Sequence, residues 1–185
     1  MLKPTKEQLA AAHQKTVPDL ISPELHVLFC GINPGLYSAA TGHHFARPGN
    51  RFWPTLYRSG FTPRLFTAAE EHQLLPLGYG ITNFVSRATA AAAELGANEL
   101  VLGAQALDEK LKTYEPEILA VLGITAYRTA YNFPKAKLGR QPHKIGRTQV
   151  WVLPNPSGLN AHFPPVALAE VFSRFREDIS GAPEW

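Results

Sequence analysis

Cysteine is almost absent from this sequence. Cys30 is the single cysteine among 185 residues, so no disulfide can form within the chain. One thiol is also too few for a four-cysteine zinc site or for an iron–sulfur cluster within the chain. The seven histidines are scattered apart from His43 and His44, and neighbouring side chains usually point apart. We therefore expect no metal site.

Long apolar runs are lacking as well. No stretch reaches the roughly 18 apolar residues that a membrane-spanning helix needs, and the first residues are polar, without the apolar segment of a signal peptide. Hydrophobic residues make up 45% of the chain and charged residues 18%, which is typical of a globular domain. We expect a cytoplasmic, intracellular monomer with no membrane partner.

The common cofactor motifs are missing too. The sequence has no G-x-G-x-x-G after its first predicted strand, no G-x-x-x-x-G-K-[ST] loop and no G-x-S-x-G nucleophile elbow. No cofactor is therefore expected. The formal net charge is +3 and the isoelectric point is about 9.1, a balance that permits a polyanionic partner without requiring one.

The chain does contain an alternation of strand-like and helix-like segments. Apolar runs predict strands at 25–31, 79–85, 118–122 and 149–154. Helices are expected at 51–59, 67–75, 99–114 and 124–131, and from Pro164-Pro165 onward. This order favours an α/β domain with a mainly parallel sheet. Residues 1–22, with a short helix over 5–14, are predicted to be an N-terminal extension of a single domain at 23–180.

Two polar loops follow the first and last predicted strands. They contain Gly31-Ile32-Asn33-Pro34-Gly35 and Asn155-Pro156-Ser157-Gly158-Leu159. Ligand sites in open α/β sheets form outside the carboxyl ends of the strands, so the two loops are expected to share one site. An isolated Asn-Pro-Gly is also compatible with a structural turn. Residues 32–50 are predicted to form a long irregular loop, and such loops are usually functional.

A basic stretch lies between 135 and 147. Gly139, Pro142 and Gly146 interrupt it, so it is predicted to be a loop. Its charged side chains are compatible either with a solvated loop or with contacts to phosphate groups.

Five segments together resemble one protein family. These are GINPG at 31–35, GHHFARPGNRFW at 42–53, GITNFVSRAT at 80–89, QPHKI at 141–145 and WVLPNPSGLN at 151–160. They are similar to the mismatch-specific uracil/thymine DNA glycosylases, the Mug/TDG branch of the uracil-DNA glycosylase superfamily. The resemblance implies a three-layer α/β/α sandwich with a four-stranded, mainly parallel sheet.

The resemblance also implies an activity and its partners. A monofunctional glycosylase of this kind flips the mismatched base, uracil of a G·U pair or thymine of a G·T pair, out of double-stranded DNA and hydrolyses its N-glycosidic bond. Thymine and exocyclic adducts are open alternatives to uracil. The abasic product would pass to downstream abasic-site repair enzymes.

Residue roles follow from the same resemblance. Asn33 matches the asparagine that orients the attacking water, and Phe45 matches the aromatic residue that stacks on the flipped base. Leu159 matches the wedge that enters the duplex, with Gly158 and Asn160 facing the widowed guanine. The remaining base-pocket positions are Ile32, Ser38, His44, Asn83 and Ser86. Contacts to the DNA backbone are expected from Ser157, Lys135, Lys137, Arg140, Lys144 and Arg147.

The chemistry that these residues allow is limited. An asparagine can orient water through its carbonyl oxygen but is a very poor base, and Ser86 stands where many relatives have an acidic residue. The leaving uracil carries its charge on its own carbonyl groups, and backbone N–H groups can stabilise that charge. Two alternatives stay open: a protein that binds lesions or abasic sites with little turnover, and a hydrolase of small nucleosides, which would not need Leu159.

Overall fold

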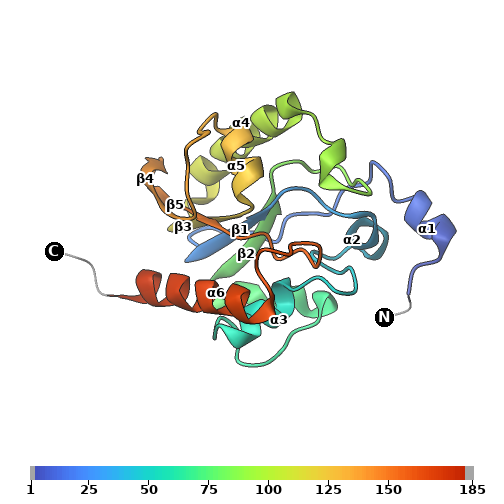
Figure 1. The fold of residues 1–185 in the computed structure, drawn as a ribbon, viewed down its shortest axis with the longest axis horizontal. Helices are drawn as coiled ribbons and strands as arrows, with labels where there is room; N and C mark the ends of the chain where they lie inside the picture. Colours follow the sequence, from blue (N-terminus) through green and yellow to red (C-terminus); the bar gives the residue numbers. More distant parts are fainter. Residues whose placement is uncertain (1–2, 182–185) are drawn as a thin grey trace.

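A single sheet forms the centre of the molecule, and helices cover both of its faces (Figure 1). The computed structural model describes residues 3–181. Strands β1 (Val27–Gly31), β2 (Tyr79–Asn83), β3 (Ile118–Leu122) and β5 (Thr148–Leu153) are mutually parallel in the order β2-β1-β3-β5. The predicted α/β class and the mainly parallel sheet are confirmed.

The sheet has five strands rather than the expected four. The additional strand, β4 (Gly139–Ile145), pairs antiparallel with β5 at the edge of the sheet. The prediction of a loop at 135–147 was wrong. It rested on Gly139, Pro142 and Gly146, and an antiparallel hairpin at the edge of a sheet tolerates all three residues. Pro142 lies within the register shift between Arg140 and Lys144, where an edge strand tolerates proline. Gly146 has φ 58° and forms the turn into β5.

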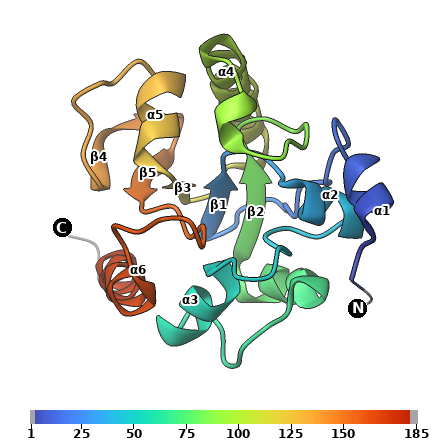
Figure 2. The ribbon, with the colours of Figure 1, turned by 45° about the vertical axis from the view of Figure 1, so that its right-hand side comes forward.

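The helices form two layers, one on each face of the sheet. Figure 2 shows α4 and α5 on one face and α3 and α6 on the other. The helical elements are α1 (Lys6–Ala10), α2 (Leu36–Thr41), α3 (Phe52–Arg58), the 3-10 helices η1 (Ala68–Leu77) and η2 (Ala92–Glu94), α4 (Ala97–Tyr114), α5 (Ile124–Ala130) and α6 (Pro165–Ser180). Helix α2 lies inside the segment predicted to be irregular, and α1 is shorter than expected. None of the described helices is long and apolar enough to cross a membrane.

The central strands β1 and β3 are buried at every position because helices cover both faces of the sheet. Val27 and Phe29 pack with α3 and α6, whereas Leu28 and Cys30 alternate onto the face covered by α4 and α5. This arrangement holds the carboxyl ends of the strands at one edge of a rigid core.

The N-terminal segment packs along the outer strand of the sheet. Leu20 pairs with Ile81 of β2 through two backbone hydrogen bonds of 2.9 and 2.8 Å. Ala12, Val17 and Leu20 are buried. The segment therefore covers a strand edge that would otherwise present unpaired backbone groups.

Candidate active site

A cavity of about 150 Å³ opens beyond the carboxyl ends of β1 and β3. The chain passes from β1 to β2 on one side and then to β3 on the other side of β1. This is the topological switch point at which open α/β sheets form their crevice. The loops after β1 and β5 both line the cavity, so the structure brings together the two predicted polar loops. The predicted site residues among its lining are Ile32, Asn33, Ser38, His44, Phe45, Asn83 and Ser157.

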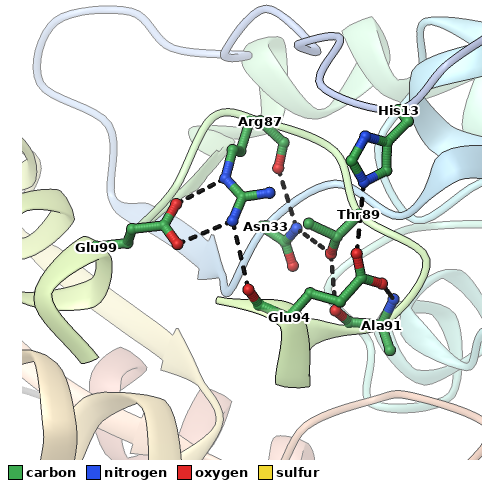
Figure 3. A network of polar contacts seen from close by, with 7 residues as sticks. All are labelled: His13, Asn33, Arg87, Thr89, Ala91, Glu94 and Glu99. Carbon is green, nitrogen blue, oxygen red and sulfur yellow. Dashed lines mark hydrogen bonds and ion pairs between the residues drawn. The ribbon is translucent and has the colours of Figure 1, made fainter. Parts of the chain in front are cut away.

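The side chain of Asn33 has a fixed orientation. Its amide nitrogen donates to the Arg87 carbonyl oxygen at 3.0 Å and to Thr89 Oγ1 at 2.8 Å. The Thr89 hydroxyl donates to the Ala91 carbonyl at 2.9 Å, so it can only accept from Asn33 (Figure 3). Both amide hydrogens are thus used. In the described part of the chain the Asn33 carbonyl oxygen has no hydrogen-bond partner, and it is available to accept a hydrogen from water.

Phe45 presents an aromatic face supported from behind. Its ring stacks on Phe52 with 4.1 Å between centroids and 24° between planes, and Phe52 is fully buried. The Phe45 backbone has φ 52°, in the left-handed region, which is unusual for a bulky residue. Strained conformations of this kind gather at ligand sites. A flat heterocycle in the cavity can therefore stack on Phe45.

A glycine allows Phe45 and Asn83 to approach one another. A Cβ atom at Gly31 would lie 2.5 Å from Asn83 Oδ1 and 3.3 Å from Phe45 Cζ. The Asn83 side chain makes no hydrogen bond to another described residue, so its amide is available to a ligand. Gly31 thus gives space to both side chains at this end of the cavity.

His44 is buried and anchors the loop that carries Phe45. Its Nε2 lies 2.9 Å from the Pro18 carbonyl oxygen, and its backbone N–H donates to Glu71 Oε2 at 2.8 Å. Burial lowers the pKa of His44 below its ordinary value. At neutral pH the ring is uncharged and donates its Nε2 hydrogen to Pro18. Glu71 was not identified from the sequence, where no motif marks it.

The loop after β5 is held in place by Arg51. The guanidinium donates to the carbonyl oxygens of Gly158 at 2.8 Å, Asn160 at 3.1 Å and Phe163 at 2.7 Å. Leu159, at the loop tip, is 81% exposed. Sequence reasoning missed Arg51 because its partners are carbonyl groups more than a hundred positions away.

The loop after β5, which carries Gly158 and Leu159, also touches the loop that carries Phe45. A Cβ atom at Gly158 would lie 2.5 Å from the Gly49 carbonyl oxygen, so the close approach needs glycine at 158. Gly158 and Leu159 line a second hollow that shares Arg47, Asn50 and Ser157 with the main cavity. The exposed leucine therefore lies next to the cavity mouth.

Ser86 does not line this cavity. It lines a neighbouring one, where Lys110 is paired with Asp19. Asn83 is the predicted site residue that both cavities share. The interpretation of Ser86 as a base-pocket residue therefore finds no support in the geometry, because the chain turns away after β2.

The basic residues near β4 are divided along the hairpin. Lys135, Lys137 and Arg140 line one hollow, and Arg140 stands opposite Trp151, toward the carboxyl end of β5. Lys144 stands opposite Gln149 near the start of β5. Arg147 lies in the turn between β4 and β5 and pairs with Glu115 at 3.5 Å. Lys135, Lys137 and Arg140 therefore lie nearer to the edge of the sheet at which the cavity opens.

The described lining of the cavity mixes polar and apolar side chains and includes neither a carboxylate nor a metal-binding cluster. Neither Asp nor Glu is among its described lining residues. Across residues 3–181, no group of three His, Cys, Asp or Glu side chains is placed to hold a metal ion. The chemistry available to the cavity is orientation of water by Asn33, stacking by Phe45 and hydrogen bonding by Asn83.

Comparison with known proteins agrees with this architecture. A solution NMR structure of a candidate uracil DNA glycosylase from Methanosarcina acetivorans superposes with a TM-score of 0.58, covering 91% of this chain and 99% of that chain at 16% sequence identity. At this identity the likeness supports the fold alone. The sequence model of the uracil DNA glycosylase superfamily matches residues 18–179. With most of its length matched, the chain belongs to the uracil DNA glycosylase superfamily.

Proposed function

We propose that this protein is a monofunctional DNA glycosylase of the mismatch-specific branch. It flips uracil out of a G·U pair in duplex DNA and hydrolyses the N-glycosidic bond, leaving an abasic site for downstream repair enzymes. Superfamily membership supports excision of uracil from DNA. The observation that carries the proposal is the fixed amide of Asn33, whose carbonyl oxygen is left to orient water.

The proposed chemistry needs no general base. Glycoside cleavage passes through an oxocarbenium-like state, and the departing uracil carries the negative charge. The Asn33 carbonyl oxygen accepts a hydrogen from water and holds it at the sugar. Because no carboxylate is found among the described lining residues, the water attacks with little activation, and we expect a slow enzyme.

Recognition of the base divides between stacking and hydrogen bonding. Phe45 stacks on one face of the uracil, backed by Phe52. The Asn83 amide lies against Gly31 at the end of β1 and bonds the pyrimidine edge. Base stacking on an aromatic side chain is worth about 1–3 kcal/mol, which offsets part of the cost of unstacking the nucleotide.

The proposed preference for mismatched duplex involves Leu159, at the tip of the loop after β5. Leu159 projects from the loop tip beside the cavity mouth and fills the gap that the flipped base leaves. Apolar wedges between base steps are a common device of proteins that distort DNA. A G·U wobble pair costs less to open than a Watson–Crick pair, so flipping favours the mismatch.

Single-turnover excision with enzyme in excess tests the proposal. Alkali cleavage would report abasic sites in labelled G·U, G·T and A·U duplexes and in single-stranded DNA containing uracil. We expect activity on G·U first. Asn33→Ala should lose about 100-fold or more in rate, as expected when a reacting group is no longer positioned, while its affinity for the duplex stays within about twofold of wild type.

The control is Asn98→Ala, which removes an exposed asparagine from α4 and should leave the rate unchanged. A wild-type protein that binds G·U duplex but releases no base would instead be a lesion-binding protein. An Asn33→Ala variant with the wild-type rate would remove Asn33 from the reaction.

A further inference from the structure

The segment that holds Asn33 is itself tied to helix α4. Arg87, whose carbonyl accepts from Asn33, forms a two-point ion pair with Glu99: Nε to Oε1 is 2.6 Å and Nη2 to Oε2 is 2.8 Å (Figure 3). Glu99 Oε2 also accepts from the Gly96 backbone N–H at 3.0 Å. A forked pair of this kind fixes direction as well as distance. The Arg87 side chain is therefore held at the start of α4.

The N-terminal segment fixes the same stretch from its other side. The Gln14 N–H donates to the Ala88 carbonyl at 3.0 Å, and the Ala88 N–H donates to the Lys15 carbonyl at 2.7 Å. His13 Nε2 lies 3.4 Å from Glu94 Oε2, and the same Glu94 accepts from the Ala91 N–H through Oε1 at 2.8 Å. The backbone around Arg87 is thus held by α4 on one side and by residues 13–15 on the other.

None of these anchoring groups lines the cavity. Arg87, Glu99 and residues 13–15 are absent from its lining, whereas Asn33, Thr89 and Ala91 belong to it. The anchoring groups can influence a bound nucleotide only through the residues that they hold. The Arg87 guanidinium lowers the pKa of Glu99 to about 2, so the pair keeps both charges at any pH at which the enzyme would be assayed.

We infer that Arg87 is a positioning residue for Asn33. Its pair with Glu99 and the strap formed by residues 13–15 hold the Arg87 carbonyl so that it receives the Asn33 amide and turns the Asn33 carbonyl oxygen toward the cavity. This inference rests on the proposed function of Asn33. It gives the N-terminal segment, which lies mostly ahead of the superfamily match at 18–179, a role in the active site.

Replacement of the remote carboxylate tests the inference. Glu99→Gln removes the charge that holds Arg87 and should lower the single-turnover rate on G·U duplex about 10- to 100-fold, because small misplacements of reacting groups are costly. Affinity for a duplex with an abasic-site analogue should stay within about twofold. The matched control is Glu109→Gln, on the same helix, where the glutamate pairs with Lys112 on the surface. Arg87→Lys should fall between wild type and Glu99→Gln, since it keeps the charge but not the fork.

A double variant separates positioning from loss of stability. Asn33→Ala/Glu99→Gln should be no slower than Asn33→Ala alone, because Glu99 acts through Asn33. If the two losses multiply, Glu99 acts by another route and the inference is wrong. Thermal melting of each variant shows whether it is folded at the assay temperature.

Hydrogen exchange of the Asn33 side-chain amide tests the inference without relying on the proposed activity. The Asn33 side-chain amide, assigned by its loss in Asn33→Ala, should show slow hydrogen exchange in the wild type and faster exchange in Glu99→Gln. Unchanged exchange, or a Glu99→Gln rate within about twofold of an active wild type, would overturn the inference. Wild-type protein that excises nothing, with exchange altered as expected, would overturn the proposed function and leave the positioning of Asn33 supported.

Discussion

At the scale of single residues, the burial of His44 decides how the cavity loop responds to pH. Its ring donates through Nε2 to the Pro18 carbonyl, and burial lowers the pKa of His44 from its ordinary value. The folded protein therefore holds His44 neutral at a pH where the unfolded chain begins to protonate it. Below an unfolded-state pKa of about 6.5, the unfolded chain binds the extra proton and gains stability relative to the fold.

The sign of this linkage gives a stability prediction. The free energy of unfolding should decrease as the pH falls from 7.5 to 5.5, with His44 contributing at most about 1.4 kcal/mol, the linkage value for one pH unit. His44→Gln, which keeps a donor near Pro18, should show a smaller decrease, measured by urea unfolding at both values. His72→Gln, which changes an exposed histidine, should behave like wild type. An equal decrease in His44→Gln and wild type would contradict the prediction.

His44 also bears on the pH dependence of the excision rate. Because no other described lining group is acidic or imidazole, excision should depend little on pH between about 7 and 9. A step in the rate below the ordinary histidine pKa of about 6.5 that disappears in His44→Gln would make His44 the general base.

At the scale of elements, the apolar strands and the longest helix were predictable, and the edge strand was not. The run Ile118–Leu122 is buried at every position, and Leu100, Ala104, Leu107 and Leu111 form the buried stripe of α4. The alternation that marks β4 is weak because an edge strand with a proline and flanking glycines has few apolar constraints. Helix α2 is short and Ser38 is its one buried residue, so its pattern carried no helical signal.

Arg51 couples two of these elements, the start of α3 and the loop between β5 and α6. We expect Arg51→Ala to release the loop that carries Leu159 and lower excision from G·U duplex about 5- to 100-fold, since an apolar wedge offsets an unstacking cost of about a few kcal/mol per base step. Excision from single-stranded DNA should change little, because no stack has to be held open. Arg58→Ala, in the last turn of the same helix, is the control.

Coupling to Leu159 distinguishes this role from general destabilisation. Leu159→Ala should show the same preferential loss on duplex, and Arg51→Ala/Leu159→Ala should lose no more than the larger single effect. Equal losses on duplex and single strand in either variant would contradict the wedge role.

At the scale of the whole molecule, three loops from distant parts of the chain meet because four parallel strands end at one edge. The loops after β1 and β5 could be expected to meet from sequence, because each follows an apolar strand. The segment at 87–89 and the N-terminal strap could not, because the two hydrogen bonds that join residues 14 and 15 to Ala88 are between backbone groups and carry no side-chain signature. The register of β4 against β5 also places Arg140 near the edge of the sheet at which the cavity opens, and Lys144 at the opposite end of the hairpin.

The positions of these cations along the hairpin predict which of them contact DNA. Lys137→Gln/Arg140→Gln removes two charges near the site end of the hairpin, and Lys144→Gln/Arg147→Gln removes two charges toward its turn. Each phosphate contact contributes about one unit to the slope of log affinity against log salt. We expect the first pair to reduce the slope by one to about two units and the second pair to leave it unchanged, measured by titrating G·U duplex at several salt concentrations. Because both variants lose the same charge, a general field effect would change both slopes alike. Equal reductions would place the whole hairpin against DNA, and two unchanged slopes would assign it to solvent.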